Sequence, residues 1–234
     1  TVREPADREP GFDRDRVLTM KFILGNDRYP DAPAVRVFHD RVLGEVRRLG
    51  EVESAAIVNH LPLNHETSML AYALPGEPST PTGQRRTTIE VGVSPEYFRT
   101  LGIAMREGRD FDARDAAGAL SVAVVNRTLA ARGWGEESPL GRQLELGSTR
   151  IPVTVIGVVN DTRHAELVGE PEAIVYRPLT QVVRRHARLA AAVHRAVARG
   201  PGLLGAPNGV DGWLLRLEQL ASLRSRRLRR ACAR

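Results

Sequence analysis

The sequence predicts an α+β fold in which a strand–helix–strand unit precedes a longer part rich in β-strands. Three observations support this prediction. Hydrophobic patterns typical of strand, helix and strand follow one another within residues 15–58, proline and glycine are frequent in residues 59–84, and short apolar segments predominate from residue 87 onward. Because proline and glycine interrupt regular structure, residues 59–84 are the expected boundary or mobile loop. We therefore expect two separable lobes, with no sheet running through both residues 18–24 and 151–159.

The strand–helix–strand unit is expected at residues 15–58. Apolar side chains at positions 18, 20, 22 and 24 alternate with polar ones, which is typical of a half-buried strand. A helix is expected to open at Asp31, to continue through apolar residues spaced by three and four from Val35 to Leu49, and to end at Gly50. Residues 52–58 then form a second apolar strand, so the unit has the length expected of one such motif.

The later part is expected to be mostly strands, at residues 87–93, 122–125, 143–146, 151–159 and 174–176. Ser94, followed by Pro95, is expected to cap a short helix that stops at Gly102. Asn126 is expected to cap a helix over residues 127–134. Apolar residues at 189, 193 and 197 form one stripe and predict a last helix.

The positive charge is concentrated in the C-terminal segment. The chain has 234 residues and a net charge of +6; residues 1–180 hold 22 basic and 26 acidic side chains, and residues 181–234 hold 12 arginines and 2 acidic side chains. A nucleic-acid-binding protein that works through this basic tail is one alternative. It is disfavoured because the arginine-rich residues 222–234 include no aromatic side chain on which a base can stack.

Several other classes of protein are excluded by what the sequence lacks. The only lysine, Lys21, does not lie in a Gly-Lys-Ser/Thr motif, so we expect no P-loop and no direct ATP binding. The only cysteine, Cys232, excludes an internal disulfide. No uncharged apolar run approaches the roughly 20 residues needed to span a bilayer, and the N-terminus does not have the pattern of a signal peptide.

One candidate metal site lies in the loop after the second strand. Asn59, His60, His65 and Glu66 provide possible ligands. Their spacing matches no known ligand motif, so we favour solvated loop residues and assign no metal.

A second candidate follows the strand at residues 151–159, where Asp161, Arg163 and His164 occur together. Strand ends often carry catalytic residues, and a soluble hydrolase-like enzyme using Asp161 and His164 is therefore a second alternative. No nucleophile motif lies nearby. We favour a structural turn in which Asp161 accepts hydrogen bonds from backbone amides near it.

A third candidate is a run of mixed charge between residues 107 and 115. Paired carboxylates can act as an acid and a base, but interspersed arginines favour a solvated and internally paired surface, anchored to the core by Phe111. The charged members are Glu107, Arg109, Asp110, Asp112, Arg114 and Asp115. The sequence thus supports no catalytic, cofactor-binding or metal-binding residue.

A series of phrases occurs in order along the chain. They are PGFDRDRVLTMKF, RYPD, VESAAIVNHLPL, SPEYFRTLGIAMREGRDF, VAVVNRTLAARGW, SPLGRQLELG, VTVIGVVNDTRHAEL and AIVYRPLTQ. Over residues 10–181 the chain resembles the MacB-like periplasmic core domain of bacterial ABC transporter permeases of the macrolide-exporter/FtsX type.

The resemblance implies an α+β fold made of a strand–helix–strand lobe with an inserted β-rich second lobe. It implies a core domain at residues 13–181, of which 13–60 are the first half of the α/β lobe and 85–180 the inserted lobe. Residues 1–12 are polar and rich in proline, so we expect them to be a disordered lead-in. Residues 182–199 would be a helix of an incomplete lobe. Residues 200–234 would be an atypical arginine-rich tail, either a genuine extension or a shifted reading frame.

The resemblance also implies a function. The domain would be non-enzymatic and would lie on the extracytoplasmic face of the bacterial cell membrane, here as a fragment without transmembrane helices. It would couple motion driven by the cytoplasmic ATPase to export or release outside. The implied partners are the transmembrane part of the permease, the ATPase subunit, and an adaptor or lipoprotein outside, with no cofactor.

Overall fold

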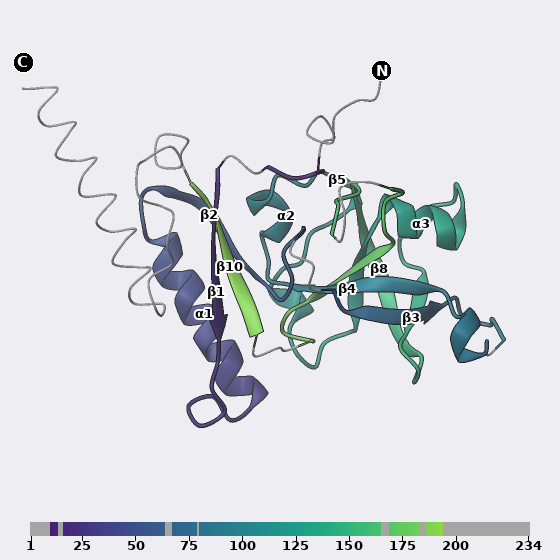
Figure 1. The fold of residues 1–234 in the computed structure, drawn as a ribbon, viewed down its shortest axis with the longest axis horizontal. Coiled ribbons are helices and arrows are strands. Elements are labelled where there is room, and N and C mark those ends of the chain that lie inside the picture. The colour runs from purple at the N-terminus through teal and green to yellow at the C-terminus, as the bar shows by residue number, and fades with distance from the viewer. Residues whose placement is uncertain are drawn as a thin grey trace, which may run out of the picture.

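A computed structural model describes residues 10–13, 16–63, 67–78, 80–164, 169–182 and 186–193. Within these residues a three-stranded layer with one long helix lies beside a β-barrel (Figure 1). In Figure 1 the helix and the three strands are on the left, and the barrel is on the right. The fold is therefore mixed α/β and rich in sheet.

The three-stranded layer contains β1 (Val17–Ile23), β10 (His186–Val193) and β2 (Val52–Val58), in the antiparallel order β1-β10-β2. Helix α1 (Ala32–Arg47) connects β1 to β2 and packs on one face of the layer. It begins where expected, because the Asp31 side chain accepts a hydrogen bond of 2.8 Å from the Ala34 amide. The apolar side chains of β1 that alternate in the sequence, Met20 and Phe22, are buried beneath α1.

Strand β10 corrects the predicted helix over residues 182–199. Residues 186–193 form a strand, and residues 183–185 and 194–199 lie outside the described part. Leu189 lies opposite Met20 on one side and Ile57 on the other, so the expected gap in the α/β lobe is filled. Both faces of β10 are buried, with Ala191 towards α1 and Ala190 towards the barrel. Tertiary packing thus overrides the high helix propensity of alanine.

Six strands close the barrel. They pair in the circuit β4-β3-β7-β8-β6-β9 and back to β4, in which only β4–β9 and β6–β8 are parallel. The strands are β3 (Met69–Ala73), β4 (Thr87–Val93), β6 (Val122–Asn126), β7 (Gln143–Leu146), β8 (Ile151–Val159) and β9 (Ile174–Pro178). Strand β5 (Met105–Gly108) adds to β8 outside the circuit. The predicted strands in this part are confirmed, whereas β5 was not predicted and β3 lies in the segment expected to be a loop.

Short helices complete the barrel part. These are α2 (Tyr97–Thr100), α3 (Arg127–Trp134) and the 3₁₀ turns η2 (Thr82–Gln84) and η3 (Ala113–Asp115). The predicted cap of α3 is confirmed, since Asn126 Oδ1 accepts a hydrogen bond of 3.0 Å from the Leu129 amide. Within the described residues, no helix is long and apolar enough to cross a bilayer.

The expected separation into two lobes without a common sheet is wrong. A continuous path of paired strands runs from β1 to β8, and it crosses between the two parts through one residue pair, Val58 with Val93. The two parts also share a hydrophobic core, in which β2 and β10 meet β4, β6, β9 and α2. Its large members include Ile89, Val91, Tyr97, Phe98, Leu101, Phe111, Ile174 and Tyr176.

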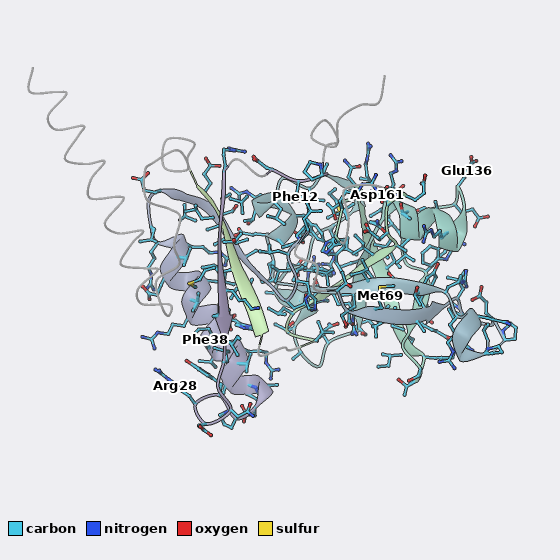
Figure 2. The ribbon with its side chains drawn as sticks, in the orientation of Figure 1. Phe12, Arg28, Phe38, Met69, Glu136 and Asp161 are labelled. Atoms are coloured by element: carbon cyan, nitrogen blue, oxygen red, sulfur yellow. The ribbon has the colours of Figure 1, made fainter. Side chains whose placement is uncertain are left out.

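The expected disordered lead-in is also wrong for its last residues. Pro10 is buried and its carbonyl accepts a hydrogen bond of 3.0 Å from the Arg163 amide. Gly11 has φ +83°, and a Cβ there would lie 2.3 Å from the Asp161 carbonyl oxygen, so only glycine fits. Phe12 packs against the shared core; it is labelled with Asp161 in Figure 2. Residues 1–9 and the tail at 200–234 lie outside the described part.

Candidate functional site

Asp161 serves the start of helix α3. Its Oδ1 accepts hydrogen bonds from the Asn126 side-chain amide at 2.8 Å and from the Thr128 backbone amide at 2.9 Å. The Arg127 Nε lies 3.8 Å from its Oδ2. A carboxylate at a helix N-terminus stabilises the unpaired amides and the helix dipole there. The expectation that Asp161 binds amides of its own turn is therefore wrong, although the observed role is also structural.

His164 does not form a catalytic pair with Asp161 in the described residues. It is 1% exposed, and neither ring nitrogen has a hydrogen-bond partner among those residues. Burial lowers the pKa of His164 to about 4, against a smaller raising effect of Glu172. Its ring packs edge-on against Tyr176, with 6.4 Å between centroids. A buried and neutral imidazole that is not hydrogen-bonded to Asp161 or to any other described residue is not arranged for general base catalysis.

Asn59 belongs to the connection between the two parts. Its backbone amide donates to the Gly92 carbonyl at 3.0 Å, and its Oδ1 accepts from the Gly92 amide at 2.8 Å. No group of three or more His, Cys, Asp or Glu side chains able to hold a metal is found in the described part of the chain. His60 is described, whereas His65 and Glu66 lie outside the described residues.

The mixed-charge run is internally paired, as predicted. Arg109 donates two hydrogen bonds to Asp115, at 2.7 and 2.9 Å, and Arg114 pairs with Asp112 at 2.7 Å. Phe111 is buried and anchors the segment. Asp115 differs from the expectation, because its side chain is only 4% exposed. The hydrogen bonds from Arg109 lower the pKa of Asp115.

Ser94 extends the pairing of β2 with β4 instead of capping α2. Its hydroxyl accepts a hydrogen bond of 2.9 Å from the Ile57 amide, and its own amide donates to the Ile57 carbonyl at 2.8 Å. The residue that precedes α2 is Glu96, which has φ +69° and makes no side-chain cap. The predicted Ser94 cap is therefore wrong.

The hydrogen bonds of Asn59 with Gly92 and of Ser94 with Ile57 connect the ends of β2 and β4. We call these four residues, Ile57, Asn59, Gly92 and Ser94, the β2–β4 joint. A Cβ on Gly92 would lie 2.9 Å from Val182 Cγ2 and 3.2 Å from Leu179 Cδ1, so the chains approach closely there. The contact of Thr100 Oγ1 with Ser54 Oγ, at 3.0 Å, adds a further buried bond between α2 and β2. Only one residue pair, Val58 with Val93, joins β2 to β4 in the sheet. The residues around this pair are nevertheless closely packed and hydrogen-bonded, which favours movement of the two parts as one body.

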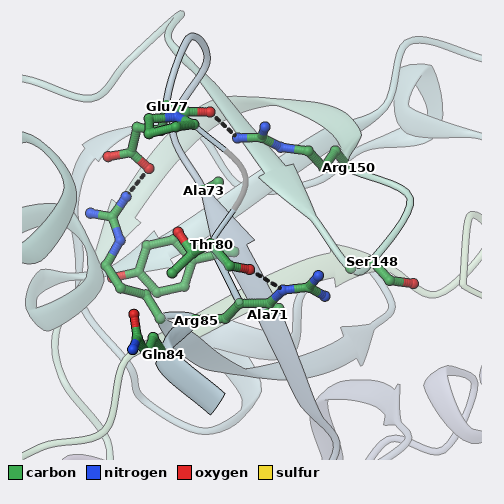
Figure 3. Close-up of a pocket in the computed structure, with 12 residues that line it drawn as sticks. Ala71, Ala73, Glu77, Thr80, Gln84, Arg85, Ser148 and Arg150 are labelled. Atoms are coloured by element: carbon green, nitrogen blue, oxygen red, sulfur yellow. Dashed lines mark hydrogen bonds and ion pairs between the residues drawn. The ribbon is translucent and has the colours of Figure 1, made fainter. Parts of the chain in front are cut away.

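Two of the hollows on the described surface differ in character. The larger, of about 630 Å³, is a mostly apolar groove between α1 and the barrel. The smaller, of about 90 Å³, lies between the β3–β4 connection and the β7–β8 turn (Figure 3). Neither hollow is lined by Asp161 or His164.

The smaller hollow is surrounded by three arginines. Arg86 pairs with Glu77 and lies 4.9 Å from the centre of the Tyr72 ring. Arg150 donates to the Glu77 carbonyl at 2.9 Å, and Arg85 donates to the Thr80 carbonyl at 3.0 Å (Figure 3). Each of the three guanidinium groups thus donates to another group of the chain. The hollow between them has a volume of only about 90 Å³. The arrangement stabilises the end of the barrel.

The start of β1 and the end of β10 lie side by side. Val17 at the start of β1 lies directly opposite Ala192 near the end of β10. Adjacent strands are about 4.8 Å apart. The chain therefore enters the three-stranded layer and finally leaves it at neighbouring points, at one end of β1 and β10.

Comparison with known proteins gives one family. The model of the MacB-like periplasmic core domain matches residues 20–200. The chain is 37% identical over 71 residues to the macrolide export ATP-binding/permease protein MacB 2 of Aeromonas hydrophila, a match that covers 30% of this chain and 11% of the relative. It is 26% identical over 172 residues to the MacB protein of Neisseria gonorrhoeae, which covers 71% of this chain and 26% of the relative.

The fold has a counterpart among solved structures. The periplasmic region of MacB from Actinobacillus actinomycetemcomitans superposes with a TM-score of 0.53 at 17% sequence identity, covering 94% of this chain and 89% of that one. At this identity the likeness concerns the fold alone. The chain spans about a quarter or less of the length of the curated relatives that it matches.

Proposed function

The chain belongs to the MacB-like periplasmic core domain family, and from this premise we propose that it is the extracytoplasmic domain of an ABC transporter permease. In this role it couples motion driven by a cytoplasmic ATPase to export or release outside the membrane. It performs no catalysis itself. The proposed partners are the transmembrane part of the permease, the ATPase subunit, and an adaptor or lipoprotein outside.

The observation that carries this proposal is the pairing of Val17 with Ala192. A domain placed between two consecutive membrane helices has to receive and return the chain at neighbouring points. Insertion into another protein is tolerated where the two ends of a domain lie close together. Within the three-stranded layer, Val17 and Ala192 meet this requirement. Residues 10–13, which precede β1, contact Arg163 and Leu101 of the barrel part. A displacement of the membrane helices would therefore reach both the layer and the barrel from this side.

The β2–β4 joint supports the coupling part of the proposal. The three-stranded layer receives the displacement, and the barrel is attached to it through the joint and the shared core. Close-packed interiors have low compressibility and transmit strain. A displacement at β1 and β10 would therefore move the barrel as well.

The two alternatives receive less support. The hydrolase alternative needs Asp161 and His164 to act together, whereas Asp161 is committed to the start of α3 and His164 is buried beside Tyr176. The nucleic-acid alternative depends on the arginine-rich residues 222–234, which lie outside the described part. The relatives are named for macrolide export. A macrolide is therefore the first cargo to test with the proposed permease.

The proposal can be tested by replacing the matching region of the gonococcal MacB relative with this chain. We expect the hybrid to export a macrolide with ATP, measured as drug efflux from cells, together with the ATPase rate of the purified hybrid. Two glycines inserted after Asn59, at the joint, should abolish efflux and leave ATP hydrolysis. The same insertion after Ser148, in the β7–β8 turn, is the matched control and should retain efflux. A hybrid that is inserted in the membrane and hydrolyses ATP without efflux would contradict the proposal.

A further inference from the structure

The smaller hollow has the size of one small ion or molecule. Its volume of about 90 Å³ is several times the roughly 10–15 Å³ that one water needs, and far below the roughly 300–1,000 Å³ of sites for larger organic molecules. It opens at one end of the barrel, between the β3–β4 connection and the β7–β8 turn (Figure 3). An occupant with a handful of non-hydrogen atoms therefore fits this space.

The lining of this hollow offers mainly hydrogen-bond donors. Three arginines line it, and each guanidinium has five N–H donors and no acceptor. Thr80, Gln84 and Ser148 add two hydroxyl groups and one amide, which can donate as well as accept. Among these described lining residues, Glu77 is the only one with a carboxylate. An excess of donors favours an occupant that is rich in acceptor atoms.

Most of these donors make no bond to the chain within the described residues. Arg85 bonds there only through Nε, to a backbone carbonyl at 3.0 Å, so both of its terminal nitrogens are unused. Arg86 uses one terminal nitrogen for the Glu77 carboxylate. Arg150 Nε lies 2.6 Å from a carboxylate oxygen of Glu145, and one of its terminal nitrogens donates to the Glu77 carbonyl. Each guanidinium therefore keeps at least one terminal nitrogen for a further acceptor.

The charges around the hollow leave an excess of positive charge. The carboxylates of Glu77 and Glu145 each pair with one arginine, whereas Arg85 has no carboxylate partner among the described residues. Arg132 adds to the excess: burial raises the pKa of Tyr72, and the nearby positive charge of Arg132 acts against this effect. The three lining arginines are half-buried, so water and salt screen their charges less than on an open surface. The excess charge favours an anion as the occupant.

We propose that the smaller hollow binds a tetrahedral oxyanion, phosphate or sulfate, through the guanidinium groups of Arg85, Arg86 and Arg150. A guanidinium presents its N–H donors in a planar fork that matches the oxygen atoms of such an ion. The ion also neutralises Arg85, whose charge the pairing within the chain leaves over. This inference concerns the chain itself and does not depend on the proposed role in a permease.

The test is a titration of the ¹⁵N-labelled full chain with inorganic phosphate, followed by two-dimensional NMR. Sodium chloride holds the ionic strength constant, so that general screening stays unchanged during the titration. We expect saturable shifts of the Arg85 and Arg150 Nε resonances. Shifts that grow in proportion to the phosphate concentration without saturation, or no shifts at these two positions, would overturn the proposal.

A second titration distinguishes the free ion from a phosphate group carried by a larger molecule. The probe is glycerol 3-phosphate, which has the same charged group on a small organic body. A tighter complex than that of inorganic phosphate assigns the hollow to a carried phosphate group, and an equal or weaker complex assigns it to the free ion. Both results support the proposal, whereas saturation by neither probe overturns it.

A pair of variants assigns the binding to the hollow. Arg85→Gln removes the guanidinium without a carboxylate partner and should weaken phosphate binding about tenfold, the lower end of the usual effect of a charged hydrogen bond. The matched control is Arg99→Gln, because Arg99 is an exposed arginine outside the hollow, 3.8 Å from Glu96. It removes the same charge from the chain and should leave the affinity nearly unchanged. Equal affinities of the two variants would overturn the proposal.

A second pair of variants leaves all the arginines in place. Gln84 is exposed and lines the hollow, so the isosteric change Gln84→Glu adds a carboxylate that repels the ion and competes for the guanidinium groups. Phosphate binding should weaken severalfold. Gln143 is exposed and outside the hollow, so Gln143→Glu is the matched control and should bind phosphate like the unaltered chain. If Arg85→Gln fails to fold, this pair decides, and equal affinities of its two members would overturn the proposal.

Discussion

Asn126 offers the sharpest test of how the barrel is held together, because its amide is saturated with hydrogen bonds in a fully buried position. Its Oδ1 accepts from the Leu129 amide at 3.0 Å and from the Ile174 amide at 2.9 Å. Its Nδ2 donates to Asp161 Oδ1 and to the Glu172 carbonyl, both at 2.8 Å. One side chain thus joins β6, α3, β9 and the segment after β8.

The substitution Asn126→Ala should cost about 3–7 kcal/mol of the free energy of unfolding. Loss of the helix cap accounts for about 1 kcal/mol. The Ile174 amide and the Glu172 carbonyl lose their partner near the core, and each unsatisfied group costs about 1–3 kcal/mol where it stays shielded from water. At about 2–4 °C per kcal/mol for a chain of this size, the melting temperature should fall by about 6–28 °C.

The measurement is urea denaturation of the full chain followed by circular dichroism. The matched control is Asn160→Ala, which removes an exposed side-chain bond to Arg106 and should change the free energy of unfolding by less than about 1 kcal/mol. A loss below about 1 kcal/mol in Asn126→Ala, equal to that of the control, would refute the reasoning.

The isosteric change Asn126→Asp should make the loss of stability depend on pH. The loss caused by Asn126→Ala, which leaves a cavity, has no such dependence. It places a second carboxylate at the position that now lies 2.8 Å from Asp161 Oδ1. Two carboxylates at this distance share a proton, and the pKa of one is raised in the folded state. A raised folded pKa means that stability is present at low pH and is lost as pH rises. The deficit relative to the unaltered chain should therefore grow from pH 4 to pH 7, and a constant deficit would count against this arrangement.

Other residues give further expected outcomes. Burial lowers the pKa of His39 and His164 to about 4, so the unfolded chain takes up their protons first as the pH falls below 6.5. The free energy of unfolding should drop by about 3 kcal/mol per histidine between pH 6.5 and 4, and the double phenylalanine variant should lose most of this slope in urea denaturation. Arg109→Ala leaves a buried carboxylate without its main partner and should cost about 1–3 kcal/mol, whereas Arg114→Ala, at an exposed pair, should leave the urea midpoint unchanged. Truncation after Leu220 should change the melting temperature by less than about 5 °C, and a larger fall would show that the tail is part of the fold.

The sequence predicts well the elements whose signals are local. The bounds of β2, β4, β7 and β8 follow from short apolar runs between turns, and α1 follows from its spacing and its cap at Asp31. The cap at Asn126 follows from the residue type before a helical run. These elements are predictable because the residues that determine each one are neighbours in the chain.

Features that depend on distant residues are not predictable in this way. Asp161 reaches Thr128, 33 residues away, and Ser94 reaches Ile57, 37 residues away. In both cases the residue type is suited to a local turn or cap, which is why the sequence indicates one. The contact that exists forms only after strands have paired. The arginine-lined hollow gives no sequence signal either, because its arginines lie on two connections that meet only when β3 pairs with β7.

Strand β10 shows how a single distant element changes the interpretation of the whole chain. Its alanines suit a helix, but β10 lies between β1 and β2 in the sheet. One of its faces is covered by α1 and the other by the shared core. Ala190 and Ala191 are fully buried, one against each of these two surroundings, so packing with distant residues and not helix propensity decides the structure here. Without β10, β1 and β2 would have no strand between them to complete the layer. With it, Val17 lies opposite Ala192, so the chain enters the three-stranded layer and finally leaves it at neighbouring points. The element that the sequence assigns wrongly is thus the one on which the proposed coupling to membrane helices depends.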